Sequence, residues 1–130
     1  ESHEFRNHKG LGIIKGSVIT LEKPTDISGK RLKIPHIGWN HVCKAKGFDS
    51  NSWDNSALEG LVDGEFMYFV HSFYVKPADP GLNLSITQYG DIEFCSSFQY
   101  KNIFACQFHP ERSGTKGLQI YRNIASLIQR

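Results

Sequence analysis

The sequence has no excess of charge of either sign, and this is the first of several informative absences. Its 15 Lys and Arg side chains nearly balance 13 Asp and Glu side chains, for a net charge of +2. Proteins that bind nucleic acid or a membrane surface usually carry a strong positive excess. No apolar run approaches the roughly 20 residues of a membrane-spanning helix, and the polar start of the chain has no signal-peptide pattern. We therefore expect neither a nucleic-acid partner nor a membrane partner.

Cysteine is also scarce. The three cysteines, Cys43, Cys95 and Cys106, form no C-x-x-C motif, and none combines with His at a spacing typical of a metal site. Scattered single cysteines are typical of proteins from a reducing compartment. We expect a cytoplasmic protein with no metal site and no cofactor.

What the sequence does contain is enough apolar material for one domain. Hydrophobic residues make up 39% of the chain and aromatic residues 12%, with no internal repeat and no low-complexity stretch. This composition argues against disorder. The length of 130 residues favours a single domain that includes the whole chain, residues 1–130.

The first half of the chain predicts an irregular set of strands. The segments are a strand pair or bent strand at residues 11–21, a short strand at 31–37, an exposed loop at 46–55, one helical turn at 56–61, and one buried strand at 65–76.

The second half has a clearer pattern. Three apolar runs, at residues 83–88, 92–98 and 103–108, are joined by very short connections, which predict an antiparallel meander. From Leu118 to Ile128 the apolar residues recur at steps of three and four, as in an amphipathic helix. Ser113 or Thr115 is placed to cap that helix.

The segment Gln107-Phe108-His109-Pro110-Glu111 carries the strongest chemical signal. In an extended backbone His109 and Glu111 point to the same side, and Pro110 biases His109 toward extended geometry. A carboxylate beside an imidazole fixes its tautomer and stabilises its protonated form. The pair is two thirds of a nucleophile–His–carboxylate triad. The same alternation places Cys106 and His109 on opposite faces.

This segment, with Ser113-Gly114 and Gly117-Leu118, resembles the C-terminal signature of class I (triad-type) glutamine amidotransferases. Residues 33–40 (Lys-Ile-Pro-His-Ile-Gly-Trp-Asn), residues 68–74 (Tyr-Phe-Val-His-Ser-Phe-Tyr) and the opening residues 10–16 are similar to the glutaminase subunits of imidazole glycerol phosphate synthases. The resemblance implies an α/β fold with the flavodoxin-like mixed sheet of class I glutamine amidotransferases. This chain would hold its C-terminal part, an antiparallel section followed by a C-terminal helix.

The resemblance also implies roles for individual residues. His109 would be the base that activates a cysteine thiol, and Glu111 would orient it. Ser72 and Phe73 match the strand whose backbone holds glutamine. Four further residues match positions that face the partner or line the route of ammonia: Tyr68, Arg112, His36 and Trp39. Arg112 stands where the family usually has Lys, and the two side chains differ in hydrogen-bond geometry.

One motif of the family is not found in the sequence. The nucleophile of these enzymes lies in a Gly-x-Cys-x-Gly turn, and none of the three cysteines has that setting. We therefore expect that the first parallel strands and the catalytic cysteine precede this segment in a complete domain, that residues 1–130 are inactive alone, and that their apolar sheet surfaces favour aggregation or need a partner.

The function implied is glutamine hydrolysis, with ammonia passed to a cyclase or synthase subunit for imidazole glycerol phosphate formation in histidine biosynthesis. Two alternatives stay open at this point. The chain could belong to a related amidotransferase that supplies ammonia for amination of a surface-polysaccharide or nucleotide-linked sugar. Nothing in these residues distinguishes between the acceptors of ammonia. The chain could also be a non-catalytic interaction domain. His71, inside an apolar run, is either a core histidine or a neighbour of the site.

Overall fold

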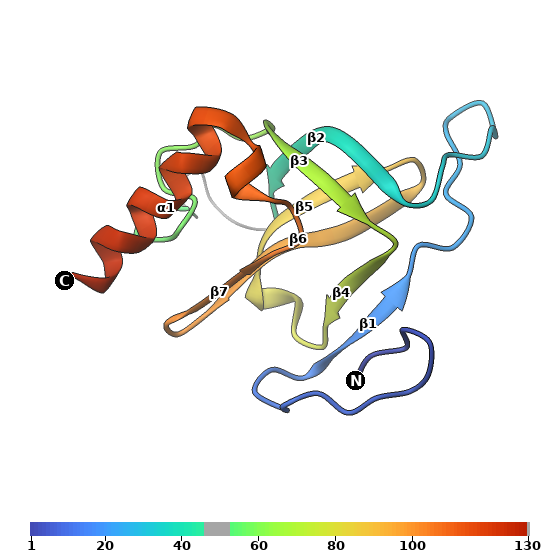
Figure 1. Cartoon of the computed structure of the whole chain (residues 1–130), viewed down its shortest axis with the longest axis horizontal. Coiled ribbons are helices and arrows are strands. Elements are labelled where there is room, and N and C mark those ends of the chain that lie inside the picture. Colours follow the sequence, from blue (N-terminus) through green and yellow to red (C-terminus); the bar gives the residue numbers. More distant parts are fainter. Residues whose placement is uncertain (46–52, 130) are drawn as a thin grey trace.

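The computed structural model describes residues 1–45 and 53–129. A five-stranded antiparallel sheet has the order β3-β2-β5-β6-β7, and a separate two-stranded sheet pairs β1 with β4 (Figure 1). The strands are β1 (Gly16–Thr20), β2 (His36–Lys44), β3 (Glu65–His71), β4 (Phe73–Pro77), β5 (Asn83–Tyr89), β6 (Ile92–Tyr100) and β7 (Ile103–Cys106). The helical elements are two short 3₁₀ turns, η1 (Pro80–Leu82) and η2 (Pro110–Arg112), and the helix α1 (Gly114–Ile128).

The second half of the chain folds as its sequence predicts. β5, β6 and β7 form an antiparallel meander, and α1 lies at one end of the sheet (Figure 1). The antiparallel section and the C-terminal helix are therefore confirmed. Short connections and helical periodicity are local properties, which is why the sequence predicts them well.

Several expectations for the first half were wrong. The single strand expected at 65–76 is broken at Ser72 into β3 and β4, which join different sheets. Only Gly16–Thr20 of residues 11–21 is a strand, and β2 begins at His36 rather than at residue 31. Residues 56–60 form turns, not a helical turn. The loop expected at 46–55 lies mostly outside the described residues.

One hydrophobic core joins the sheet to the helix. Phe69 of β3, Phe94 of β6, Phe108 and Ile120 of α1 are each at most 2% exposed and belong to the same cluster. The segment after residue 52 joins it through Trp53, whose indole N–H donates to the carbonyl of Leu84 over 2.8 Å. This core holds the segment 107–113 between β7 and α1, where the candidate site lies.

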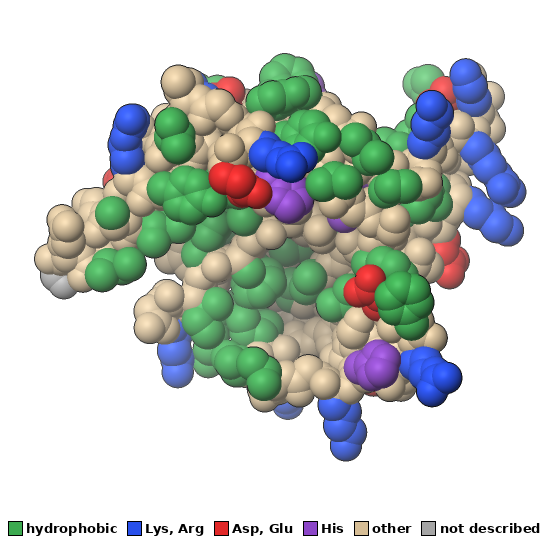
Figure 2. Space-filling model, in the orientation of Figure 1, with side chains coloured by type: hydrophobic (Ala, Val, Ile, Leu, Met, Phe, Trp, Pro, Cys, Tyr) green, Lys and Arg blue, Asp and Glu red, His purple; other side chains and the backbone are tan. Residues whose placement is uncertain are grey.

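A second apolar surface is open. A groove of about 750 Å³ runs between the N-terminal segment and the edge strands, and its apolar lining includes Leu11, Ile13, Val75, Phe98 and Ile103. Figure 2 shows hydrophobic side chains gathered around a hollow between β7 and the N-terminal segment. Leu11 is 92% exposed.

Candidate active site

His109 and Glu111 are in direct contact, as their spacing predicts. The Nδ1 atom of His109 lies 2.8 Å from Oε1 of Glu111, and both side chains are part exposed, at 39% and 53%. A carboxylate only accepts, so Nδ1 carries the proton and Nε2 is left as a base. The contact is confirmed by this distance, while the catalytic role of the pair stays a prediction.

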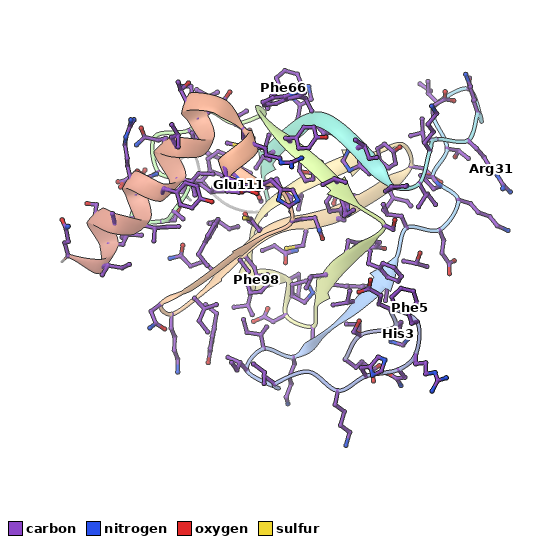
Figure 3. All side chains as sticks on the ribbon, viewed as in Figure 1. His3, Phe5, Arg31, Phe66, Phe98 and Glu111 are labelled. Carbon is purple, nitrogen blue, oxygen red and sulfur yellow. The ribbon has the colours of Figure 1, made fainter. Side chains whose placement is uncertain are left out.

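The backbone that makes this contact is not the one expected. His109 is extended, with φ −106° and ψ 95°, as a residue before proline usually is. Glu111, however, lies in the 3₁₀ turn η2, not in a continuing strand. Figure 3 labels Glu111, which lies beside the start of α1. The turn brings the carboxylate back toward the imidazole.

The Glu111 carboxylate is held in its ionised form. Its own backbone N–H, and after it the His109 imidazole, hold the pKa of Glu111 below its ordinary value. The hydroxyl of Tyr121 on α1 lies 3.5 Å from the second carboxylate oxygen. A negative charge therefore faces Nδ1 of His109 at neutral pH.

Ser113 fixes the loop that carries His109. Its hydroxyl donates to the carbonyl of His109 over 2.7 Å and accepts from the N–H of Tyr68 over 3.0 Å. The N–H of His109 in turn donates to the carbonyl of Tyr68 over 2.9 Å. Ser113 is at the N-cap position of α1 but makes no side-chain capping bond, so its expected role as a cap was wrong. It joins the loop to β3 instead.

Gly117 allows α1 to lie against η2. A Cβ atom at this position would lie 1.9 Å from the carbonyl oxygen of Pro110 and 2.9 Å from the Cβ of Ser113. Real Cβ atoms do not approach backbone so closely, so only glycine permits this packing. Gly117 belongs to the motif that carried the resemblance, and its role is to let the helix support the His109 turn.

A cavity of about 460 Å³ opens beside His109, and Cys106 lines it together with His109 and Glu111. Every residue from Cys106 to Glu111 lines this cavity, so the lining does not test the expectation that Cys106 and His109 point to opposite faces, which stays a prediction. β7 ends at Cys106, so strand alternation does not extend to His109.

The three thiols are nevertheless poor nucleophiles. Burial raises the pKa of Cys106 to about 12, with a further contribution from the charge of Glu111, and burial raises the pKa of Cys95 to about 12. Burial and Asp63 raise the pKa of Cys43. The thiolate is the reactive form. The Cys106 thiol donates to the carbonyl of Phe108 rather than to His109.

Ser72 and Phe73, the predicted glutamine-binding residues, lie at the break between β3 and β4. The carbonyl of Ser72 accepts from the N–H of Leu21 over 2.9 Å. The carbonyl of Phe73 faces Nδ1 of His71 at 2.9 Å. Burial lowers the pKa of His71, and His109 acts in the same direction.

The residues predicted to face a partner separate into two environments. Trp39 and Tyr68 are cross-strand partners on the outer face of β2 and β3, with ring centroids 6.0 Å apart, and Arg112 is exposed. His36 is only 3% exposed. Of its two expected roles, a place on the partner surface does not fit this burial, and a place along the route of ammonia stays a prediction.

The sequence analysis missed two supporting features. Ser113 was interpreted as a helix cap and as part of the family signature, but not as the link between the His109 loop and β3. Nothing in the sequence pairs His36 with His71. His36 lies at the start of β2 and His71 at the end of β3, so antiparallel pairing of these strands can bring them together. The strand register that makes them direct partners is seen only in the fold.

Within residues 1–45 and 53–129, no helix is long and apolar enough to cross a membrane. The same described residues contain no group of three or more His, Cys, Asp or Glu side chains arranged to hold a metal ion.

Comparison with known proteins gives a consistent result. The family model "Glutamine amidotransferase class-I" matches residues 10–126. The chain is 45% identical over 123 residues to the imidazole glycerol phosphate synthase subunit HisH of Aquifex aeolicus, covering 95% of this chain and 52% of that protein. It is 41% identical over 127 residues to the same subunit of Pyrococcus furiosus, covering 98% and 58%.

The chain thus spans about half the length of the curated relatives it matches. The match includes both the His109–Glu111 turn and the β2–β3 segments. This chain belongs to the class I glutamine amidotransferase family.

Proposed function

We propose that this chain supplies the His–Glu part of a glutaminase site, and that the ammonia released is used to form imidazole glycerol phosphate in histidine biosynthesis. The observation that carries the proposal is the 2.8 Å contact between His109 Nδ1 and Glu111 Oε1 beside an open cavity. The names of the relatives favour this acceptor over the sugar acceptors considered above.

In this proposal, His109 and Glu111 have the following roles in glutamine hydrolysis. Nε2 of His109 takes the proton of a cysteine thiol, and the thiolate attacks the γ-carboxamide carbon of glutamine. The proton passes from His109 to the amide nitrogen, which leaves as ammonia, and a γ-glutamyl thioester remains. Water then hydrolyses the thioester, with His109 as base, to give glutamate and the free thiol. Glu111 keeps the imidazole in the correct tautomer throughout.

Residues 1–130 form the C-terminal part of the domain in this proposal, and the nucleophile comes from a preceding part of a longer polypeptide. Three observations support this division. The chain covers 52–58% of the first relatives, it has no Gly-x-Cys-x-Gly turn, and its own thiols are held in the unreactive form.

The outer face of β2 and β3 is the proposed surface for a cyclase or synthase partner in a heterodimer. Ile37, Trp39, Phe66 and Val70 are between 39% and 59% exposed. Ile37 pairs with Val70 across the two strands, and next to them Trp39 pairs with Tyr68 and Phe66 with His41. Phe66 is labelled in Figure 3, and hydrophobic side chains gather at the same place in Figure 2. Apolar and aromatic side chains gathered in this way are typical of an interface. Arg112 would provide an ion pair at its edge.

A glutamine-hydrolysis assay tests the proposal. Residues 1–130 alone should release no ammonia above background, whereas the protein encoded by the complete reading frame should release it in the presence of its partner. In that protein His109→Ala should lower the turnover rate by about a hundredfold or more, because base catalysis contributes that much. Ammonia release by residues 1–130 that is lost in Cys106→Ser would identify a different nucleophile and overturn the proposal.

Partner binding is tested separately. Trp39→Ser should weaken binding of the cyclase partner by about tenfold or more, as for a central aromatic of an interface. Ile27→Ser is the matched control, since Ile27 is fully exposed in a distant turn. Equal binding by the two variants would exclude this surface.

A further inference from the structure

His36 and His71 form a buried pair that the proposed chemistry does not use. They are cross-strand partners at the start of β2 and the end of β3, and they are only 3% and 8% exposed. Nδ1 of His36 lies 2.9 Å from Nε2 of His71. A buried polar pair of this kind needs every hydrogen-bonding atom satisfied.

The direction of each hydrogen bond in this group follows from the acceptor at one end of the series, the Phe73 carbonyl. The Phe73 carbonyl only accepts, so Nδ1 of His71 donates to it over 2.9 Å. In a neutral ring Nε2 of His71 must then accept, and His36 donates from Nδ1. Nε2 of His36 accepts in turn, and the side-chain amide of Asn40 faces it at 3.3 Å. Three side chains therefore donate in one direction, from Asn40 through His36 and His71 to the carbonyl of Phe73.

The surroundings keep both rings neutral and fixed. Burial lowers the pKa of His36 to about 4, and the neighbouring His71 adds to this effect. Burial also lowers the pKa of His71, and the nearby His109 contributes in the same direction. The His36 ring is stacked between Phe69 and Tyr89, with centroids at 5.0 and 4.1 Å.

The last hydrogen bond of this series, from His71 to the Phe73 carbonyl, reaches the backbone that is proposed to hold glutamine. Phe73 directly follows the break at Ser72 and begins β4, where it pairs with Thr20 of β1. The N–H of Leu21 donates to the Ser72 carbonyl at the end of this pairing, and the His71 ring holds the Phe73 carbonyl from the side of β3.

We propose that His71 is a positioning residue for glutamine binding, which holds the Ser72–Phe73 backbone through its Nδ1–H, and that His36 fixes the tautomer of His71. This inference rests on the proposed function. It makes neither histidine a catalytic residue, since both act through the backbone.

Two substitutions by amide side chains distinguish the roles of the two ring nitrogens of His71. In His71→Asn the amide nitrogen takes the place of Nδ1 and can still donate to the Phe73 carbonyl. In His71→Gln the amide takes the place of Nε2, and this donor is lost. Both variants remove the ring from the core, and Gln keeps one more methylene group than Asn, so a higher KM in His71→Gln cannot come from a greater loss of packed volume.

The measurement is the KM for glutamine and the kcat of ammonia release, in the complete protein with its partner. We expect His71→Gln to raise the KM by about tenfold, with kcat within about threefold, and His71→Asn to stay within about threefold of the parent in both. His36→Gln, which removes the donor to His71, should raise the KM by a smaller factor. Equal KM values for the two His71 variants, with equal losses of melting temperature, would overturn the inference and leave the proposed function intact.

A second readout needs no glutamine. Long-range ¹H–¹⁵N correlation spectra of the complete protein report the tautomer of each histidine, and we expect Nδ1–H for both His36 and His71 at pH 7. An Nε2–H tautomer at His71 would overturn the inference in any protein that folds. A parent protein that releases no ammonia from glutamine would overturn the proposed function, and the glutamine-binding role of His71 with it.

Discussion

The hydroxyl of Ser113 donates a hydrogen bond over 2.7 Å to the backbone carbonyl of His109. The same oxygen accepts from the N–H of Tyr68, so one buried side chain joins the loop of the His–Glu pair to β3. This contact explains how an irregular segment between a strand and a helix keeps a defined geometry.

Replacing Ser113 by Ala should destabilise the protein. Ser113 is 3% exposed, so the substitution leaves the Tyr68 N–H and the His109 carbonyl each without this partner in a buried place. We expect the free energy of unfolding to fall by about 1–3 kcal/mol, measured by urea denaturation of the complete protein. Ser126→Ala, at an exposed site on α1, is the control and should change it by less than about 0.5 kcal/mol. Equal effects would show that the bridge contributes nothing to stability.

Gly117→Ala should separate α1 from η2. The added methyl group would meet the Pro110 carbonyl oxygen at 1.9 Å, so the helix has to move. We expect a loss of about 2 kcal/mol or more in the free energy of unfolding. Changed ¹⁵N shifts of the His109 ring should accompany it. Gly10→Ala is the matched control, because a Cβ atom there has nothing within 4 Å. An unchanged His109 spectrum would mean that the turn does not depend on helix packing.

Acid should destabilise the protein through His36. Its folded-state pKa of about 4 lies below the ordinary value of 6.5, so between these values the unfolded chain binds more protons. The stabilisation is complete above pH 6.5 and is lost as the pH falls toward 4, by about 3 kcal/mol for this group. The lowered pKa of His71 acts in the same direction.

Urea denaturation at several pH values measures this slope. His36→Asn should flatten it, whereas His8→Gln, which removes an exposed imidazole, should leave the His36 contribution in place. A parent protein that is equally stable at pH 7 and pH 4.5 would contradict the argument.

The thiols should react slowly with iodoacetamide. With pKa values of about 12, Cys95 and Cys106 have almost no thiolate at pH 8, and their alkylation should be at least about a hundredfold slower than that of free cysteine. Intact-mass spectrometry follows the reaction, and labelling in 6 M guanidinium is the control in which all three should react. Rapid labelling of Cys106 that slows in His109→Ala would reveal an activated thiol and contradict the proposed role of His109.

Much of the site was predictable because it is local in the sequence. His109 and Glu111 are two residues apart around a proline, so their contact depends on a few backbone angles. The meander and α1 follow from short connections and from helical periodicity. The motifs around these residues were sufficient to predict the family that the comparisons confirm.

The remaining features depend on contacts between distant segments, and only the tertiary structure decided them. The break at Ser72 and the buried pairing of His36 with His71 both depend on strand register and close packing. Register is set by which faces can be buried together, and that is a property of the assembled sheet and helix. The sequence by itself determined which chemical groups are present and which are neighbours along the chain, and the fold determined which of them meet.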